Sequence, residues 1–141
     1  MSSPFTLKIG ATQVFNALTE DLPVGGSRKV DNAPDTYMAV HVERLTAKTY
    51  SICHYFEQNG DLCQDPEVVF LICYGWVMPV MFQQALPPVY RETVILDGAD
   101  QPTGYREAWL KDLVVFCNTW LRNVSEQQGG VDGIRDARAS R

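Results

Sequence analysis

The feature that most constrains the fold is a series of strand-like segments that follow one another between residues 37 and 96 with short links. Apolar and polar side chains alternate along most of these segments, as they do in a strand with one buried face. Short links favour antiparallel neighbours, so the sequence predicts a meander of roughly five strands. The predicted strands are Tyr37–Leu45, Lys48–Glu57, Glu67–Tyr74, Trp76–Gln84 and Val89–Leu96.

Two predicted helices flank this series. The first covers Ala11–Asp21, where apolar residues recur at helical spacing. The second covers Tyr105–Gln127 and carries a broad apolar stripe from Trp109 to Val124. A sheet with an apolar face needs a cover, and this stripe is the natural candidate. We therefore predict an α+β fold in which the N-terminal helix and the long C-terminal helix pack on one face of an antiparallel sheet.

The predicted elements form a single domain over residues 1–130. A chain of 141 residues is long enough for one hydrophobic core and short for two. Residues 24–36 are rich in Gly, Pro, Asp and Asn, and are predicted to form a loop. Gly129 and Gly130 end the second helix, and the polar residues 131–141 are predicted to form a flexible C-terminal tail.

Charge argues against nucleic acid as the partner. The formal net charge is -5 and the sequence pI is about 4.9, whereas phosphate contacts need a concentrated positive field. A nucleic-acid-binding regulator would require a local basic patch, and it is the weakest of the functional alternatives. The residues that could form such a patch are Arg28, Lys29, Arg44, Lys48 and Arg91.

The sequence predicts a cytoplasmic protein with reduced thiols. Met1–Gly10 has neither the basic nor the apolar region of a signal peptide. The longest apolar stretch, Val68–Phe82, is interrupted by Gly75 and Pro79, so no membrane span is predicted. The four cysteines form no C-x-x-C pair, which leaves zinc-ribbon and thioredoxin-like motifs without support. No metal and no cofactor are predicted.

The link between the second and third predicted strands contains a strong turn signal, Asn59-Gly60. A tight hairpin at this dipeptide would place Pro66 opposite Cys53, where the proline has no N–H for the ladder. The sequence therefore predicts a longer loop over residues 58–66.

The longer loop fixes a register that can be checked. Gln58 would then lie opposite Val68, and the pairing would bring Cys53 opposite Cys73. Two thiols would meet inside the sheet.

The densest run of side chains able to do chemistry surrounds this link. His54, with Glu57, Asp61 and Asp65, could act as a general base or a metal ligand, as in a small hydrolase or metal-dependent enzyme. The structural alternative is that His54 packs with the apolar residues of its strand face, while Asn, Gly and Asp build a turn. The enzyme hypothesis requires His54 and at least two of the carboxylates to converge in one cleft.

The large aromatic and amide side chains of the strands are candidates for a binding surface. If the helices cover one face of the sheet, aromatics on the other face would be exposed, and such patches mark partner sites. An aromatic-rich core would explain the same composition without an interface. We predict a small non-enzymatic binding protein that contacts an unknown host or element protein, with a homo-oligomer as a further way to cover the face. The candidate binding residues are Tyr55, Glu57, Asn59, Asp61, Trp76, Gln83 and Gln84.

A specific motif begins at His54. The chain reads H-Y-F-E-Q-N-G-D-L from His54, and D-P-E follows from Asp65 after two further residues. This stretch resembles an uncharacterised bacterial family with the pattern H-Y-[YF]-E-Q-N-G-D-L-x-x-D-P-E, which is found largely on plasmids, integrative elements and phages. The resemblance covers about residues 50–123 and includes Phe82–Gln84, Lys111–Leu113 and Trp120–Asn123.

The resemblance implies a small intracellular domain of unknown function, and it supplies no catalytic residue. Accessory genes on such elements often counter host defence or regulate transfer, so the resemblance implies, by analogy, a mobile-element accessory or anti-defence role. An acidic protein could serve that role by occupying a nucleic-acid-binding surface of a host protein.

Overall fold

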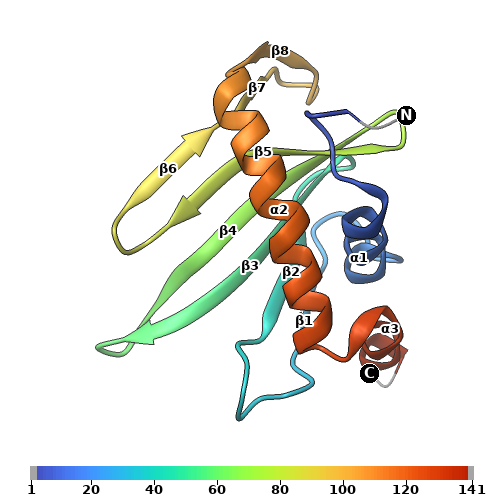
Figure 1. Cartoon of the computed structure of the whole chain (residues 1–141), viewed down its shortest axis with the longest axis vertical. Helices are drawn as coiled ribbons and strands as arrows, with labels where there is room; N and C mark the ends of the chain where they lie inside the picture. Colours follow the sequence, from blue (N-terminus) through green and yellow to red (C-terminus); the bar gives the residue numbers. More distant parts are fainter. Residues whose placement is uncertain (1–2, 140–141) are drawn as a thin grey trace.

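Six strands form one antiparallel sheet in which each strand pairs with its neighbours in the sequence (Figure 1). The computed structural model describes residues 3–139, apart from the side chains of Phe56, Glu57, Gln58, Leu62 and Ala139. The predicted α+β class and antiparallel meander are confirmed, with one strand more than expected. The strands are β1 (Ser27–Val30), β2 (Val40–Arg44), β3 (Thr49–Gln58), β4 (Asp61–Cys73), β5 (Trp76–Gln84) and β6 (Val89–Glu92).

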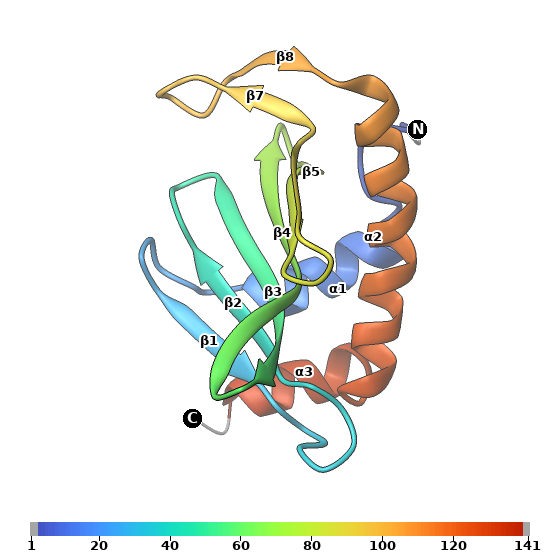
Figure 2. The ribbon, with the colours of Figure 1, turned by 90° about the vertical axis from the view of Figure 1, so that its left-hand side faces the viewer.

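The helices pack on one side of this sheet, as predicted (Figure 2). They are α1 (Ile9–Thr19), α2 (Glu107–Gln127) and α3 (Gly130–Ala139). α1 is wedged between the sheet and α2, so the long helix covers the sheet partly through α1 rather than alone. No helix within the described residues is long and apolar enough to cross a membrane.

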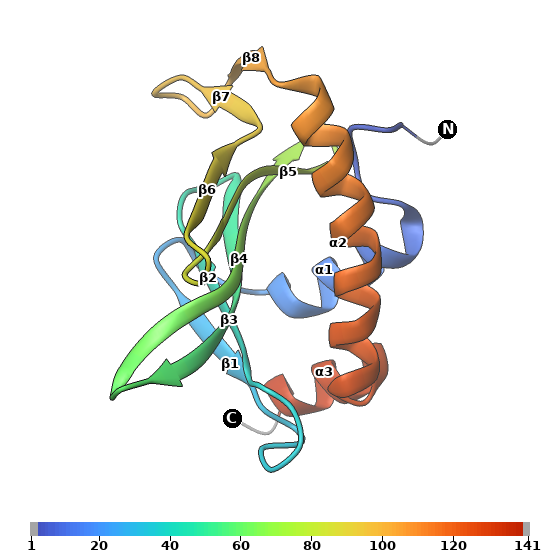
Figure 3. The same cartoon turned by 60° about the vertical axis from the view of Figure 1, so that its left-hand side comes forward.

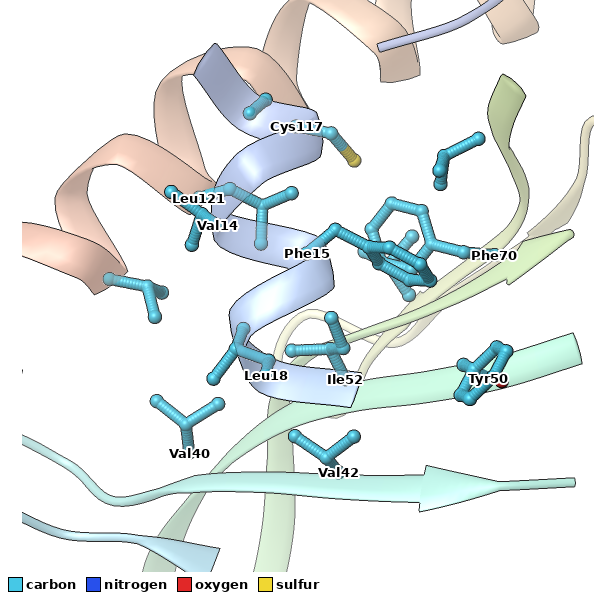
Figure 4. Close-up of a cluster of buried hydrophobic side chains, with 14 of the residues drawn as sticks. Val14, Phe15, Leu18, Val40, Val42, Tyr50, Ile52, Phe70, Cys117 and Leu121 are labelled. Atoms are coloured by element: carbon cyan, nitrogen blue, oxygen red, sulfur yellow. The ribbon is translucent and has the colours of Figure 1, made fainter. Parts of the chain in front are cut away.

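The core centres on Phe15 of α1, which is fully buried (Figure 4). Its ring meets Tyr50 edge-on at a centroid distance of 5.6 Å and is tilted against Phe70 at 5.4 Å. Cys117 and Leu121 of α2 close the same cluster from the helix side. Burial of one aromatic side chain contributes about 1.5–3 kcal/mol, so α1 is a central part of the core.

β1 lies within residues 24–36, so the prediction of a loop there is wrong at this strand. Val30 supplies the strand's buried apolar side chain, and one such residue gives a weak alternation signal. Arg28 stabilises the strand from the helix side, because its Nη1 donates to the carbonyl oxygens of Leu18 (2.9 Å) and Glu20 (2.7 Å) at the end of α1. Cations favour this end of a helix, where carbonyl groups lack intrahelical partners.

β3 and β4 form a tight hairpin at Asn59-Gly60, so the predicted loop over residues 58–66 is wrong. Both turn residues have positive φ, 53° and 85°, as a two-residue hairpin turn requires. Pro66 is accommodated because the register shifts beside it, between Cys53 and Tyr55. A bulge at that point removes the need for a ladder N–H from the proline.

The hairpin register also corrects the predicted cysteine pair. Cys53 lies opposite Glu67, and Cys73 lies opposite Trp76 near the next turn. The shorter link moves every β4 residue relative to β3, so the two thiols do not meet. All four cysteines are free.

The predicted strand Val89–Leu96 is interrupted at Thr93. The buried Thr93 hydroxyl donates to the carbonyl oxygen of Pro79 (2.7 Å), and beyond it the chain leaves the main sheet. Val94 then joins a second apolar cluster with Val80 and Leu110 of α2. A separate two-stranded sheet follows, made of β7 (Val94–Leu96) and β8 (Pro102–Tyr105).

α3 occupies Gly130–Ala139, so the prediction of a flexible tail from residue 131 is wrong over this helix. Ile134 is fully buried against the main cluster. Arg135 and Arg138 both contact the Glu20 carboxylate, at 2.8 Å and 3.2 Å. These contacts hold α3 against the end of α1. They join residues more than a hundred positions apart, so the polar composition of the segment does not reveal them.

Candidate binding face of the sheet

One face of the sheet points away from the helices (Figure 3). The strand pairings place a row of polar side chains on this face. The strand registers place one residue from each of the six strands in this row, which we call the polar row. Antiparallel sheets commonly leave one face to water, so a polar face alone is ordinary. What distinguishes this one is how its side chains contact each other. The polar row consists of Lys29, His41, Cys53, Glu67, Gln83 and Tyr90.

The polar row crosses a hollow of about 380 Å³ on the β1–β4 half of this face. Cys53 and Ser51 lie at its floor, because they are only 2% and 4% exposed. Tyr55 and Glu67 line the same hollow, with Glu43 nearer the exposed rim. The hollow is therefore lined mainly by polar and charged groups and by two rings rather than by an apolar wall.

Glu67 is held in a fixed position at this hollow. The Ser51 hydroxyl donates to one carboxylate oxygen (2.6 Å), and the Gln83 side-chain amide donates to the other. Hydrogen bonds to a charged acceptor are stronger than neutral ones. The carboxylate is thus presented in one orientation before any ligand arrives, which lowers the entropy cost of binding.

His41 and Tyr55 form the aromatic part of the hollow. Their rings meet edge-on at a centroid distance of 5.0 Å, which places Tyr55 on the same face as His41 despite the bulge. Burial lowers the pKa of His41, and the positive charge of Lys29 adds to that effect. The hollow therefore favours the neutral form of His41.

Cys53 and Tyr55, two further ionisable residues of the hollow, also stay neutral. Burial, together with the nearby charge of Glu67, raises the pKa of the Cys53 thiol to about 12. Burial likewise raises the pKa of the Tyr55 hydroxyl to about 12, with a further contribution from Cys53. A nucleophilic cysteine needs a lowered pKa, so this thiol is not activated for attack. Neutral hydrogen-bonding groups therefore lie beside the fixed carboxylate, and the charged Arg28, Lys29 and Glu43 complete the lining.

His54 lies on the opposite, helix-covered side of β3. It pairs with Val40 across the sheet, is 5% exposed, and meets the Trp120 ring edge-on at 5.6 Å. Its Nε2 is buried without a hydrogen-bond partner, and burial lowers the pKa of the ring. This placement matches the packing alternative for His54.

The structure does not bring His54 together with the carboxylates named beside it. Asp61 is exposed at the hairpin turn, and Asp65 is exposed at the bulge. Neither forms a hydrogen bond or ion pair with His54, although the charge of Asp65 partly opposes the lowered pKa of the ring. The side chain of Glu57 lies outside the described part. Within that part, no three His, Cys, Asp or Glu side chains gather closely enough to hold a metal ion.

The predicted binding residues are spread over the molecule. Tyr55 and Gln83 lie on the open face, whereas Asn59 is at the hairpin turn. Trp76 begins β5 and is 47% exposed, and Gln84 donates to the carbonyl oxygen of Pro87 at the other end of that strand. Two of these side chains therefore belong to the candidate face, and three do not.

The predicted binding residues omit four residues of the site. His41, Ser51, Cys53 and Glu67 come from three strands, and the registers between those strands bring them together. Alternation places His41 and Glu43 on the same face of one strand, and Ser51 and Cys53 on the same face of the next strand. The tight Asn59-Gly60 hairpin is the signal that could have shown that Glu67 lies beside these residues, because it sets Glu67 opposite Cys53.

The fold and this face define the chain as a small α+β domain with a six-stranded meander, helices on one side and a preorganised polar surface on the other. The model of the DUF6908 family, described as a domain of unknown function, matches residues 11–130. The chain belongs to this family. No curated protein and no solved structure matches it.

Proposed function

We propose that this domain is a binding protein whose open sheet face docks on a basic surface of a partner protein. The observation that carries the proposal is the fixed Glu67 carboxylate at the hollow, held by Ser51 and Gln83. A cationic side chain of the partner would enter the hollow and pair with it. Preorganised charged groups of this kind give specificity and fast association.

The charges of this face support a basic partner. Glu43 and Glu92 lie beside the polar row in the neighbouring register, and Glu67 lies within it. Two cations also line the hollow. Lys29 is paired with Asp31 at 3.7 Å, and Arg28 donates to the carbonyl oxygens of Leu18 and Glu20 on the helix side. The whole chain is also acidic, with a formal net charge of -5. The field at this face therefore attracts cations.

The aromatic groups of the hollow support a cationic side chain in particular. Arginine and lysine bind favourably over tyrosine rings, and Tyr55 lies at the hollow with Glu67. The neutral His41 and Tyr55 hydroxyl supply hydrogen-bonding groups without adding charge. An arginine would use both the carboxylate and the ring, because its guanidinium combines a planar fork with a delocalised charge.

The resemblance to mobile-element proteins extends the proposal to a biological role. We propose that the domain acts in the cytoplasm as an accessory or anti-defence protein of such an element. Proteins that bind nucleic acid present lysines and arginines to phosphate groups. An acidic face can occupy that surface and keep the nucleic acid away from a host protein.

Binding of a short fluorescein-labelled oligo-arginine peptide tests the proposal. Fluorescence anisotropy at low and physiological salt gives the Kd of the whole chain and of two matched variants. Glu67→Gln removes the fixed carboxylate, and Glu107→Gln removes one exposed carboxylate from α2 on the other side of the sheet. Glu67→Gln should raise the Kd about tenfold, the effect of losing roughly 1.4 kcal/mol.

The Glu107→Gln control distinguishes binding at the hollow from attraction of the peptide to the acidic protein as a whole. Glu107→Gln should change the Kd little, because it alters the net charge equally without touching the hollow. Equal weakening by both variants would mean that the peptide binds the acidic protein without using this face. A Kd unaffected by Glu67→Gln would reject the proposed site.

A further inference from the structure

β6 is the last strand of the main sheet, and its outer edge pairs with no strand among the described residues. The N–H of Thr93 donates to the carbonyl oxygen of Val80 (2.9 Å), and in an antiparallel ladder this directs the backbone groups of Tyr90 and Glu92 outward. The Glu92 carbonyl accepts a hydrogen bond from Arg106 (2.8 Å). The N–H and C=O of Tyr90 and the N–H of Glu92 therefore remain available at this edge.

A groove of about 210 Å³ lies beside this strand, between β6 and α2. In Figure 1, α2 passes over β5 and leaves β6 uncovered. Trp109 and Phe116 of α2 are each 39% exposed at the groove, and Phe82 meets the Phe116 ring edge-on at 5.7 Å. Pockets for whole small molecules measure roughly 300–1,000 Å³, so this groove suits one large apolar side chain.

Two arginines lie against the Trp109 ring, and one of them, Arg91, lines the groove. The guanidinium of Arg91 lies 5.0 Å from the centroid of the Trp109 ring, and that of Arg106 lies 5.6 Å from it. Asp112 also lines the groove and offsets one of these charges. On the helix side of β6 two arginines outnumber one aspartate, in contrast to the open face, where Glu92 lies. This side therefore favours an acidic side chain on the same face of the peptide as the apolar one.

We propose that the β6 edge and this groove bind an extended peptide segment of a partner protein by strand addition. The unpaired backbone groups select an extended chain, and the groove accepts one apolar side chain. The arginines favour an Asp or Glu two positions away, on the same face of the added strand. Every second side chain of the added strand falls on the helix side, beside Arg91 and at the mouth of the groove. This surface is separate from the open-face hollow and does not rest on the function proposed for it.

A second copy of the chain fits this edge less well than a peptide does. Antiparallel pairing of two β6 strands about Arg91 would set the two arginines directly opposite each other. Like charges in that position destabilise a strand pair.

Selection from a displayed library of random peptides on the immobilised full chain tests the proposal. The enriched peptides should alternate in polarity, with a large apolar residue two positions from an Asp or Glu.

Fluorescence anisotropy then gives the Kd of one labelled peptide. Trp109→Ala removes a groove wall, and Tyr90→Pro removes an outward N–H without touching the ladder with β5. Each should raise the Kd at least about tenfold. Val115→Ala, at a residue that is 68% exposed, is the matched control on α2 and should leave the Kd unchanged.

Backbone recognition is tested on the peptide itself, so the outcome does not depend on the folding of any variant. N-methylation of alternate peptide amides should abolish binding in one of the two frames, because only one set of amides faces β6. Failure to enrich an alternating sequence, or equal affinity in both N-methylated frames, would overturn the proposal. Light scattering that shows a dimer broken by Tyr90→Pro would also overturn it, in favour of a second copy at this edge.

Discussion

The two faces of the six-stranded sheet are built on opposite principles. The helix-covered face packs apolar side chains such as Phe15, Ile52 and Phe70, which have no exposed surface. The open face joins polar side chains to one another, with Glu67 fixed by Ser51 and Gln83. Stability therefore depends mainly on one face, which leaves the other free to serve recognition. Substitutions on the two faces should separate these roles.

The largest effect is expected from Phe15→Ala on the covered face. The change empties a fully buried site between the sheet and α2, and loss of a core phenylalanine costs about 3–5 kcal/mol. Urea unfolding followed by circular dichroism measures the change in the free energy of unfolding. Phe15→Leu, which retains more volume, should cost less. A loss below about 1 kcal/mol for Phe15→Ala would show that α1 is not central to the core.

A smaller effect is expected from Gln128→Ala at the junction of α2 and α3. The buried side-chain amide accepts from the Asn32 N–H (2.8 Å) and donates to the Met38 carbonyl oxygen (3.2 Å). Its removal leaves two polar backbone groups without partners, at a cost of about 1–3 kcal/mol. Gln127→Ala, one residue earlier, is the control and should cost less. Equal losses for the two variants would mean that the junction does not rely on this amide.

The covered face should also contribute a pH dependence through His54. Its pKa is lowered by burial, so the unfolded chain binds more protons below about pH 6.5 and stability falls as the pH decreases through that range. His54→Phe should remove this part of the slope. Because the pKa of His41 is lowered as well, His41→Asn serves as the comparison from the open face. Urea midpoints from pH 7 to pH 5 measure both slopes. An unchanged slope in His54→Phe would contradict the buried neutral state.

The smallest effect on stability is expected from the open face. Glu43 and Glu92 are exposed at its rim, and the double change Glu43→Gln, Glu92→Gln should alter the free energy of unfolding by no more than about 0.5 kcal/mol. The same double variant should weaken oligo-arginine binding, because two acidic charges leave the face. Thermal melts and anisotropy titrations check the two halves of this prediction. A large loss of stability would show that the open face also holds the fold together.

The covered face was largely predictable from the sequence, because its signal is local. The apolar stripe of α2 and the alternation in β2, β3 and β5 indicate helices and strands within a few residues of their observed positions. β1 was not predictable in this way, because Val30 is its one buried apolar residue. Arg28 of the same strand is held by a hydrogen bond to the end of α1, and no local pattern reveals that contact. α3 was missed for the same reason: its placement depends on Glu20, far away in the chain.

The open face was less predictable, because its site exists only when strand registers are known. Tyr55 and Gln83 can be named from composition, but Glu67 becomes a site residue only when the hairpin sets it opposite Cys53. Pro66 argued against that hairpin, and the bulge beside it removes the conflict. His54 shows the reverse error, since a residue type suited to chemistry lies in the packed layer.

The wedged position of α1 has a consequence for synthesis on the ribosome. Phe15 leaves the ribosome about a hundred residues before Cys117 and Leu121, which close its pocket. At the usual translation speed of about 5–20 residues per second, that interval lasts about 5–20 seconds. During this time the apolar face of α1 lacks the helix that finally covers it. Nascent chains stalled before α2 should therefore recruit chaperones, and chains stalled after it has left the exit tunnel should not.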